Sequence, residues 1–565
     1  MFLSSRRQVI GQEREQATRI YDAAYDEVNL PAELAAGAMW SLRVRVQNQS
    51  NWIWRRHDPE SKNVDLTVWI DGQIAVTQSL PVEEVHPGER IDFRVPFRIP
   101  GAVGSHEIVI DMIEQNVALF KDKGSAPLKV GINVFAAPVT QGAVLQEKAN
   151  RLCPWNYQPS AGIQAGADGA HYPLFVARSK GAHFWDTEDR QYIDYVMGWG
   201  CALLGYAEPR VQEAVRRALE SGAVVPLPHA LEVEVAEMLT EDIPCAERVV
   251  FGKNGSDACT VAARLARAYT GRNVILYSGY HGWQDWWVEQ VGFENCGVPD
   301  RATPLIHRFK FNNQADFQQL FDLYKHDLAA IMLEPSGPAE GPQGSPQDAN
   351  PAFLLFLADS AKRAGALLIY DEIMTGFRYP GGSVQKATGV IPDLTCLGKA
   401  LGGGMPLSAL TGRAAIMESA MHRTHYGPTF KGEIYSLAAA KVALGIYRSE
   451  PVAEQVWAHG NKLREGVNRL SSELGVNARC VGPAFRATVV FSDNDVSLIR
   501  LKRTLYFQEL LKRGVMTYNG FMLPSYAHDD QMLNRLLECA GLALERVARA
   551  ERNGTLDRAI EIPLL

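Results

Sequence analysis

The sequence has no closely spaced cysteine pair and no cysteine before residue 153. Its eight cysteines stand at positions 153, 201, 245, 259, 296, 396, 480 and 539, and no two are arranged as CxxC. This scatter argues against a disulfide scaffold and against a zinc site. We therefore expect reduced thiols, a cytoplasmic location and no bound metal.

Long apolar runs are also missing. No stretch approaches the roughly 20 apolar residues that a membrane helix needs. The basic pair Arg6-Arg7 leads into the polar run of residues 12–16, without the apolar core of an export signal. We expect a protein that is neither exported nor embedded in a membrane.

Neither sign of charge dominates. The chain has 57 Lys+Arg against 64 Asp+Glu, a formal net charge of -7, which gives no reason to expect a nucleic-acid partner. A hydrophobic content of 46% with 9% aromatics excludes a disordered or fibrous chain. The length of 565 residues suits roughly three or four domains.

The first 140 residues change periodicity near residue 36. Before it, apolar residues at three- and four-residue steps predict one helix between residues 10 and 35. After it, apolar and polar residues alternate, and Asp71-Gly72 between two apolar runs predicts a hairpin. Short strands separated by Pro-Gly turns are typical of an antiparallel β-sandwich. The strands are expected at 40–46, 64–68, 91–95, 107–112 and 128–134.

From about residue 145 the pattern is that of an α/β protein. Short apolar runs at 248–251, 274–277, 329–333 and 367–370 alternate with helical segments, which predicts a mostly parallel sheet with helices on both faces. Amphipathic helices near the end predict a small α+β C-terminal domain. The expected organisation is an N-terminal helix (1–35), a β-sandwich (36–137), a linker (138–150), a long α/β segment (151–445) and the small domain (446–565).

An acid and a lysine each follow one of the predicted buried strands. Asp371 ends the run that begins at Leu367, and Lys399 stands between Gly398 and Gly402. The carboxyl ends of parallel strands meet at one edge of a sheet, so the two side chains should be neighbours. Taken singly, Lys399 could be a surface lysine and Asp371 a helix cap.

Pyridoxal phosphate requires this pair of groups. The lysine amine forms a Schiff base, and the acid pairs with the pyridine nitrogen. At about 4 Å and an effective dielectric near 20, the ion pair is worth roughly 4 kcal/mol, or about three pKa units. That is enough to keep the ring protonated as an electron sink.

A second motif predicts an anion site. Gly255 and Ser256 follow a predicted strand and begin a predicted helix, where unpaired N–H groups and the positive end of the helix dipole attract a phosphate. Gly255 lets the backbone approach closely, and the Ser256 hydroxyl adds a donor. The alternative is an ordinary capped helix start.

Two further segments are less specific. Tyr280, beside Gly279, could stack on a flat ring or belong to the core, and His281 is interpreted as structural rather than as a base. Thr429 stands in a Gly-Pro-Thr-Phe-Lys-Gly loop that precedes a helix, which by itself indicates only a loop and a cap.

In this order the motifs resemble those of class III aminotransferases, most closely the branch that contains glutamate-1-semialdehyde 2,1-aminomutase. The likeness runs from about Tyr157 to the C-terminus. It implies a fold-type I pyridoxal-phosphate enzyme that acts as a homodimer with its site at the subunit interface. It also implies that Lys399 forms the Schiff base and moves the proton, while Asp371 pairs with the ring nitrogen.

The same resemblance implies the remaining contacts. Ile373 and Tyr280 would cover the two faces of the cofactor ring. Gly255 and Ser256 would hold the phosphate, and Thr429 would reach in from the partner subunit. Trp199 matches an aromatic residue near the substrate.

Departures from the family pattern concern the substrate. Residues 161–169 lack the arginine that clamps the substrate carboxylate in the aminomutase, and they include Asp168. Losing such a clamp costs about 1.5–3 kcal/mol, so glutamate semialdehyde is not the expected substrate. Glu433 replaces a common asparagine and adds an acid where substrate could sit. Residues 336–340 lack the asparagine that contacts the phenolic oxygen of the cofactor, and Met374 cannot replace it.

The sandwich resembles small β-sandwich modules found beside bacterial surface-polysaccharide enzymes. Trp52, Trp54 and Trp69 could form a face that stacks on sugars, or they could be core or interdomain residues.

The resulting prediction is a pyridoxal-phosphate aminotransferase with an accessory sandwich. An amino-acid donor would supply the amino group, and a carbonyl of a sugar or small polar metabolite would accept it, in surface-polysaccharide or secondary metabolism. One alternative keeps the cofactor but shifts the amino group within one molecule, as an aminomutase does. A second alternative is a catalytically inactive carbohydrate-binding or scaffold protein.

Overall fold

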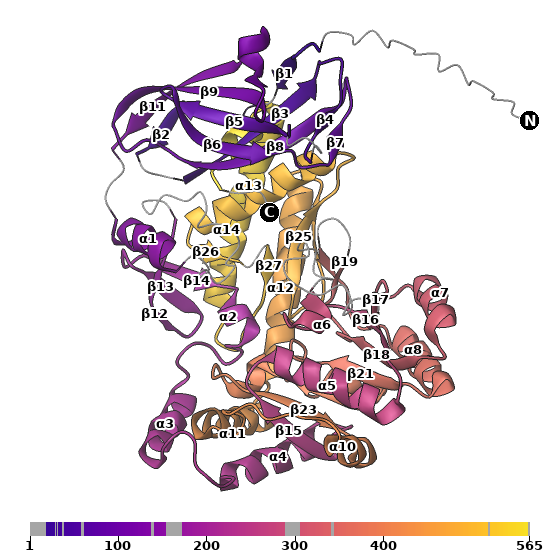
Figure 1. Cartoon of the computed structure of the whole chain (residues 1–565). Coiled ribbons are helices and arrows are strands. Elements are labelled where there is room, and N and C mark those ends of the chain that lie inside the picture. Colours follow the sequence, from indigo (N-terminus) through magenta and orange to yellow (C-terminus); the bar gives the residue numbers. More distant parts are fainter. Residues whose placement is uncertain are drawn as a thin grey trace, which may run out of the picture. The chain divides into compact units, whose positions relative to one another are not determined.

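The computed structural model describes residues 19–26, 28, 30, 32–36, 39–57, 62–136, 140–153, 172–288, 305–340, 344–517 and 520–562. These residues fall into two compact units (Figure 1). One unit holds the described residues up to 136, and the other holds those from 140 onward.

The first unit is a β-sandwich, as predicted. One sheet has the order β1-β3-β8, and the other has the order β2-β11-β9-β5-β6 with β10 beside β9. Alternate residues of both sheets, such as Val44, Leu66 and Ile110, share one buried core. The strands are β1 (Ala23–Asp26), β2 (Glu33–Ala35), β3 (Met39–Asn48), β4 (Trp54–Arg55), β5 (Val64–Ile70), β6 (Gln73–Ser79), β7 (Glu84–Val85), β8 (Arg90–Arg98), β9 (Gly104–Glu114), β10 (Ala118–Leu119) and β11 (Leu128–Phe135).

The hairpin prediction is confirmed. β5 and β6 pair antiparallel, and the two residues between them, Asp71 and Gly72, have φ angles of 49° and 81°. Positive φ at both positions is the geometry of the tight turn that matches the twist of the two strands.

The prediction of a helix over residues 10–35 is wrong for its described part. β1 pairs with β3 and β2 pairs with β11, so both segments join the sheets. Hydrogen bonds along a sheet edge outweigh the marginal stability of an isolated polar helix. Residues 1–18 lie outside the described residues.

The prediction of a linker over 138–150 is also wrong for most of that stretch. A helix, α1 (Gln141–Leu152), begins there, and the Thr140 hydroxyl caps it by accepting a hydrogen bond from the Ala143 N–H at 3.1 Å. Residues 137–139 lie outside the described residues.

The sandwich tryptophans do not share one open face. Trp54 is fully buried and Trp69 is 7% exposed, with the Lys121 ammonium over its ring. The Trp52 ring packs edge-on against Tyr21 and lies under the Arg19 guanidinium. The arrangement is that of core aromatics and not of a sugar-stacking platform.

The second unit is built on a seven-stranded sheet of order β15-β23-β22-β21-β18-β16-β17, parallel except for β23. The predicted fold-type I architecture is thus confirmed. The strands are β15 (Arg248–Gly252), β16 (Val274–Ser278), β17 (Ile306–Arg308), β18 (Leu328–Leu333), β21 (Leu367–Asp371), β22 (Leu394–Leu397) and β23 (Ser408–Gly412).

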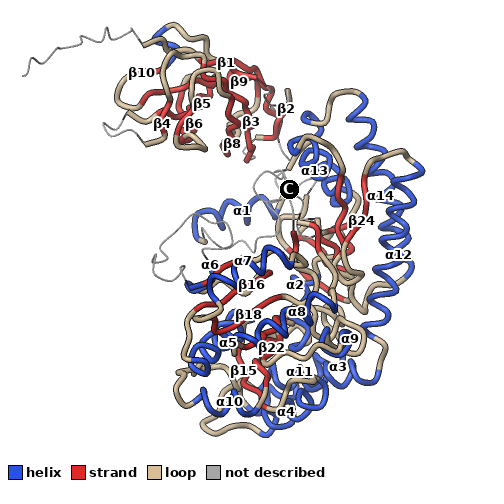
Figure 2. Tube along the Cα trace, turned by 90° about the vertical axis from the view of Figure 1, so that its right-hand side faces the viewer, coloured by secondary structure: helices blue, strands red, loops and turns tan. Residues whose placement is uncertain are grey.

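Helices cover both faces of this sheet (Figure 2). Successive residues of one strand point to opposite faces, and they pack against different groups of helices. On β21, Ile369 packs in a cluster with α5 and α10, whereas Leu368 and Tyr370 pack in a cluster with α7, α8 and α11. Residues buried on both sides explain the continuous apolar runs of the sequence. The helices are α3 (Pro209–Ala218), α4 (Ala230–Asp242), α5 (Gly255–Thr270), α6 (Asp285–Val288), α7 (Gln314–Tyr324), α8 (Pro351–Ala364), α9 (Val384–Thr388), α10 (Ala414–Met421) and α11 (Ile434–Ser449).

The C-terminal part has a core of its own. It contains α12 (Val452–Glu473), β24 (Ala478–Val481), β25 (Ala487–Phe491), α13 (Val496–Lys512), β26 (Val515–Met516), β27 (Phe521–Met522) and α14 (Asp530–Arg552). The strands β12 (Val176–Lys180), β13 (His183–Asp186) and β14 (Gln191–Asp194) join it, because β14 pairs with β26.

The predicted boundary between residues 445 and 446 therefore needs revision. It falls inside α11, whose residues up to Ile446 belong to the core of the large sheet. Among the described residues, no helix has both the length and the apolar character required to cross a bilayer.

A buried histidine should make the second unit sensitive to acid. The Nε2 of His459 lies 2.9 Å from the Tyr195 hydroxyl, and burial lowers the pKa of His459 to about 4. An unfolded histidine titrates near 6.5, so the neutral side chain contributes stability above that pH, and the contribution is lost as the pH falls from 6.5 towards 4. The total is about 3 kcal/mol at most.

We expect His459→Gln to weaken the loss of unfolding free energy between pH 7 and pH 4.5, as followed by denaturant titration. The matched control is His326→Gln at an exposed position. Equal slopes in the wild type and both variants would contradict the assignment.

Candidate active site

A cavity of about 380 Å³ opens at the carboxyl ends of the parallel strands in the second unit. Its volume is within the range of small-molecule sites. The lining includes six residues that the sequence singles out: Gly255, Ser256, Tyr280, Asp371, Ile373 and Lys399. Segments up to 144 positions apart (399 − 255) thus meet at one place, as the topology predicts.

Lys399 follows β22 after Gly398 and begins a short 3₁₀ turn, Lys399–Gly402. Its φ angle is 46°, in the left-handed region that costs a non-glycine residue of order 1 kcal/mol or more. The Nζ atom lies 4.0 Å from the Met374 sulfur. Burial lowers the pKa of Lys399 to about 8, so the neutral, nucleophilic amine is available near neutral pH.

Asp371, the last residue of β21, is 1% exposed. Its Oδ2 lies 2.7 Å from His281 Nδ1 and accepts a hydrogen bond from the Cys259 thiol at 3.3 Å, while Oδ1 accepts one from the Ile373 N–H at 3.1 Å. The carboxylate is held in one orientation from three sides. His281 is therefore a positioning residue for Asp371, which goes beyond the structural role inferred from the sequence.

The same three side chains form a compact donor set. Ligand atoms of Cys259, His281 and Asp371 lie within 4.8 Å of one another. All three are buried, and Asp371 already accepts hydrogen bonds from the other two. These hydrogen bonds explain the cluster without an ion.

The start of α5 also lines the cavity. This helix begins at Gly255, and the Asp257 carboxylate turns back to accept a hydrogen bond from the Asn254 N–H at 2.8 Å. A Cβ on Gly255 would lie 2.6 Å from Ile373 Cδ1, and one on Gly282 would lie 2.5 Å from Ser256 Oγ. Gly282 also has a φ of 120°, so glycine is favoured there, whereas a side chain at Gly255 would require the Ile373 side chain to shift.

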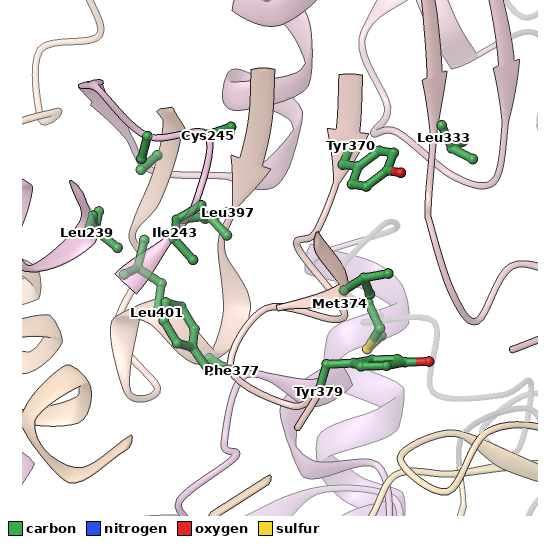
Figure 3. Close-up of a cluster of buried hydrophobic side chains, with 14 of the residues drawn as sticks. Leu239, Ile243, Cys245, Leu333, Tyr370, Met374, Phe377, Tyr379, Leu397 and Leu401 are labelled. Atoms are coloured by element: carbon green, nitrogen blue, oxygen red, sulfur yellow. The ribbon is translucent and has the colours of Figure 1, made fainter. Parts of the chain in front are cut away.

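Tyr280 and Ile373 lie at the cavity wall, and Tyr280 is 53% exposed. Ile373 is fixed by its contact with Gly255. Figure 3 shows part of the hydrophobic core near the two strand ends, where Met374 and Phe377 follow β21 and Leu397 ends β22. Buried apolar side chains thus pack next to the ends of β21 and β22, which carry Asp371 and precede Lys399.

Three predicted residues do not line this cavity. Trp199 lines a neighbouring cavity of about 940 Å³, which shares Cys201, Gly404 and Met405 with the first. Thr429 stands exposed on a turn between α10 and α11. Glu433 is the N-cap of α11, and its carboxylate accepts hydrogen bonds from the backbone and the hydroxyl of Ser436.

Glu433 is also neutralised by a lysine. Lys253 Nζ lies 2.7 Å from Glu433 Oε2, and Lys253 is the partner that lines the cavity. Burial raises the pKa of Glu433, but hydrogen bonds from Lys253 and Ser436 outweigh this and lower it overall. Glu433, which the sequence suggested for the substrate region, thus caps a helix and forms an ion pair with Lys253.

Sequence reasoning missed three charged residues beside the site. Glu334, which follows β18 and lines the cavity, is 8% exposed, and burial raises its pKa. Arg486, just before β25, lies 4.0 Å from its carboxylate. Arg378 is fully buried and donates to the carbonyl oxygens of Met374 and Gly200. Arg486 comes from a segment with no motif of its own, so no sequence signal connects it to the site.

The cavity, its lysine and its buried acid define a pyridoxal-phosphate enzyme of fold-type I. Residues 165–538 match the family model for class-III aminotransferases, and the chain belongs to this family. It is accordingly a pyridoxal-phosphate-dependent aminotransferase by family.

Known relatives agree with this assignment. The chain is 32% identical over 433 residues to a glutamate-1-semialdehyde 2,1-aminomutase of Akkermansia muciniphila, covering 72% of this chain and 100% of the relative. It is 30% identical over 400 residues to a 3-aminobutyryl-CoA aminotransferase of Cloacimonas acidaminovorans, covering 70% and 92%. The FumI protein of Sphingopyxis sp. MTA144, solved in its PLP internal aldimine form, has a TM-score of 0.67 at 28% identity over 73% of this chain and 97% of that one.

The residues present suit the cofactor. The lining combines an oriented buried carboxylate, a helix N-terminus with glycines beside it and an amine of lowered pKa. These are the three groups that the ring nitrogen, the phosphate and the aldehyde require.

The lowered pKa of Lys399 predicts the pH dependence of cofactor attachment. At pH 7 an amine of pKa 8 is neutral about 300 times more often than one of pKa 10.5. When pyridoxal phosphate is mixed with the cofactor-free protein, the near-visible absorbance should appear about tenfold faster per pH unit up to pH 8 and then level off.

Two variants serve as controls for this experiment. Lys399→Ala should abolish the covalent signal, whereas Lys325→Ala, at a partly exposed position where the ammonium pairs with Asp322, should leave it unchanged. A rate that keeps rising beyond pH 9.5 would contradict the lowered pKa.

Proposed function

We propose that this enzyme transfers an amino group from an amino-acid donor to the carbonyl group of a sugar or small polar metabolite. The observation that carries the proposal is that Lys399 and Asp371 line the same cavity, one with a lowered pKa and the other buried and oriented. An inactive scaffold would have no need to retain a strained lysine and a buried acid at a cost in stability.

Lys399 is the proposed catalytic residue. Bound pyridoxal phosphate would supply an electron sink for the electron pair released when the α-proton of the donor leaves. The neutral Lys399 amine would hold the cofactor through its aldehyde, and as a free amine it would accept and deliver the proton that the donor loses. Its left-handed backbone and its contact with Met374 limit the directions that Nζ can reach.

Asp371 and the α5 terminus are the proposed cofactor-binding residues. Asp371, oriented by His281, offers its carboxylate to the ring nitrogen. Gly255 and Ser256 hold the phosphate at the helix N-terminus. Tyr280 and Ile373 exclude water from the two ring faces, and Trp199 bounds the approach to the substrate from the neighbouring cavity.

The sequence supports an acceptor other than glutamate semialdehyde. Residues 161–169 lack an arginine, and they lie outside the described residues. The negative charge of Glu433 is cancelled by Lys253 at 2.7 Å. A polar acceptor that is held by hydrogen bonds suits such surroundings better than an acid that requires a fixed cation.

Transfer of the amino group requires a second substrate as donor, whereas an intramolecular shift requires none. With a ¹⁵N-labelled amino-acid donor, we expect the label in a new primary amine and one equivalent of keto acid per turnover. The measurement is mass spectrometry of both products, with Lys399→Ala as the inactive control. Product formed without any donor would instead establish the aminomutase alternative, which the relative from Akkermansia muciniphila keeps open.

We also propose a homodimer in which Thr429 completes the site of the partner subunit. Support comes from the exposure of Thr429 on a turn that leads into α11, whose cap Glu433 is bonded to the cavity residue Lys253. The exposed hydroxyl would add a donor for the phosphate.

Mixed dimers test this arrangement. Lys399→Ala and Thr429→Asp should each be nearly inactive alone, the second because a carboxylate repels the phosphate. A dimer with one subunit of each type would contain one intact site and should recover about half of the wild-type activity. If Thr429 served its own subunit, neither site of the mixed dimer would be intact and no activity would return.

A further inference from the structure

We propose that Asp194 and Tyr206 are positioning residues for the substrate, because their hydrogen bond holds a strained turn at the boundary between the cofactor cavity and the neighbouring cavity. This turn is α2 (Met197–Gly200). The inference rests on the proposed function, which places Trp199 at the approach to the substrate. It names the groups that keep this wall in place.

The backbone of α2 is left-handed throughout. Met197, Gly198, Trp199 and Gly200 have φ angles of 48°, 59°, 53° and 84°. L-amino acids usually enter this region one residue at a time, and each non-glycine residue there carries an energetic cost. Four such residues in succession, two of them with large side chains, persist only where groups outside the turn hold them.

The turn borders both cavities. Gly198 and Trp199 line the neighbouring cavity of about 940 Å³, and Cys201, the residue after the turn, lines that cavity and the cofactor cavity. Gly404 and Met405 also line both. A change in the conformation of the turn would therefore alter the wall that a substrate meets, without displacing Asp371 or the start of α5.

The Asp194 carboxylate holds the start of the turn. Asp194 ends β14 and is 4% exposed, and its Oδ1 accepts hydrogen bonds from the Val196 N–H at 2.7 Å and the Met197 N–H at 3.3 Å. Its Oδ2 accepts a hydrogen bond from the Tyr206 hydroxyl at 2.7 Å. Burial raises the pKa of Asp194, so the loss of any of these donors would leave a costly buried acceptor.

Tyr206 connects this carboxylate to the β12–β13 hairpin. Its backbone N–H donates to the Gly181 carbonyl at 2.7 Å, and its carbonyl accepts from the Gly181 N–H at 2.8 Å. A Cβ on Gly198 would lie 3.9 Å from the Tyr206 hydroxyl oxygen, so this side chain packs directly against the turn. A simple cap would need only Oδ1 of Asp194. The second oxygen is bound by a residue 12 positions further along, which ties the strained turn to a paired segment.

Removing the Tyr206 hydroxyl should weaken substrate binding without slowing the reaction of bound substrate. In Tyr206→Phe the turn would leave its left-handed form part of the time, and the apparent dissociation constant rises as the competent fraction falls. We expect the donor concentration for half-maximal rate to rise about tenfold, with a limiting rate within about threefold of the wild type. The measurement is the loss of near-visible absorbance of the cofactor-loaded enzyme at increasing concentrations of alanine, glutamate or 3-aminobutanoate.

Tyr172→Phe is the matched control. Tyr172 is 2% exposed, its hydroxyl donates to Glu561 Oε2 at 2.8 Å, and it lines neither cavity. This variant loses the same kind of hydrogen bond and should keep the wild-type dissociation constants. The rate of cofactor attachment to Lys399 should equal that of the wild type in both variants, because neither change touches the cofactor-binding residues.

Changes at Asp194 test whether the hydrogen bonds are what matters. In Asp194→Asn the side-chain oxygen can still accept from the Val196 and Met197 N–H groups, and the amide can donate to the Tyr206 oxygen. We expect this variant to bind the donor within about threefold of the wild type, whereas Asp194→Ala should bind it at least as weakly as Tyr206→Phe. Adding Tyr206→Phe to Asp194→Ala should change binding by less than about twofold, because the partner of the hydroxyl is already absent.

The outcomes separate the two proposals. A wild-type dissociation constant in Tyr206→Phe, an equal rise in Tyr172→Phe, a smaller amount of active enzyme with unchanged binding, or additive effects in the double variant would overturn the positioning role. The proposed transfer reaction would survive each of these results. A wild type that reacts with no donor in the panel would count against the transfer reaction and, with it, against this inference.

Discussion

The site depends on a carboxylate that is almost completely withdrawn from water. Asp371 is 1% exposed, and among the described residues its only ion-pair contact is with His281. A buried acid without a full positive charge beside it is costly. The fold accepts this cost because β21 ends at the sheet edge and because His281, Cys259 and the Ile373 N–H hold both oxygens. A cationic ring that enters the cavity would supply the missing charge, so the same acid that weakens the empty fold strengthens cofactor binding.

Strained backbone occurs in the segments that carry Lys399, Trp199 and Arg378. Lys399, Phe377, Trp199 and Met197 all have positive φ angles between 46° and 63°. Arg378 links two of these strained segments, since its guanidinium donates to the Gly200 carbonyl on one side and to the Met374 carbonyl on the other. Strain of this kind persists only where the surroundings determine the geometry. The buried Arg378 therefore connects the turn that carries Trp199 to the wall that carries Lys399.

Much of this could be read from the sequence, and the reasons for the failures are specific. Strands β16, β18 and β21 were predictable because burial on both faces leaves continuous apolar runs. Asp371 was predictable because it ends such a strand, and Lys399 because it stands two residues after the end of β22. The segment 23–35 was misread because its pairing with β3 and β11 depends on residues up to 100 positions away (133 − 33). The Lys253–Glu433 and Glu334–Arg486 pairs join residues separated by 180 (433 − 253) and 152 (486 − 334) positions, and no local pattern records such contacts.

These two ion pairs also divide the site into a fixed end and an adjustable end. Beside the start of α5, Lys253 and Glu433 are 2.7 Å apart and both bond to Ser436, so their charges cancel within a closed network. At the other end, Arg486 and Glu334 are 4.0 Å apart and share no hydrogen bond. A tight pair resists exchange because a competing ion must replace both charge and hydrogen bonds, whereas a loose pair yields to any anion with better geometry. Relatives named for an aminomutase and for an aminotransferase share the fold. Differences in substrate are then expected at the loose end, where one side chain can change without disturbing the cofactor.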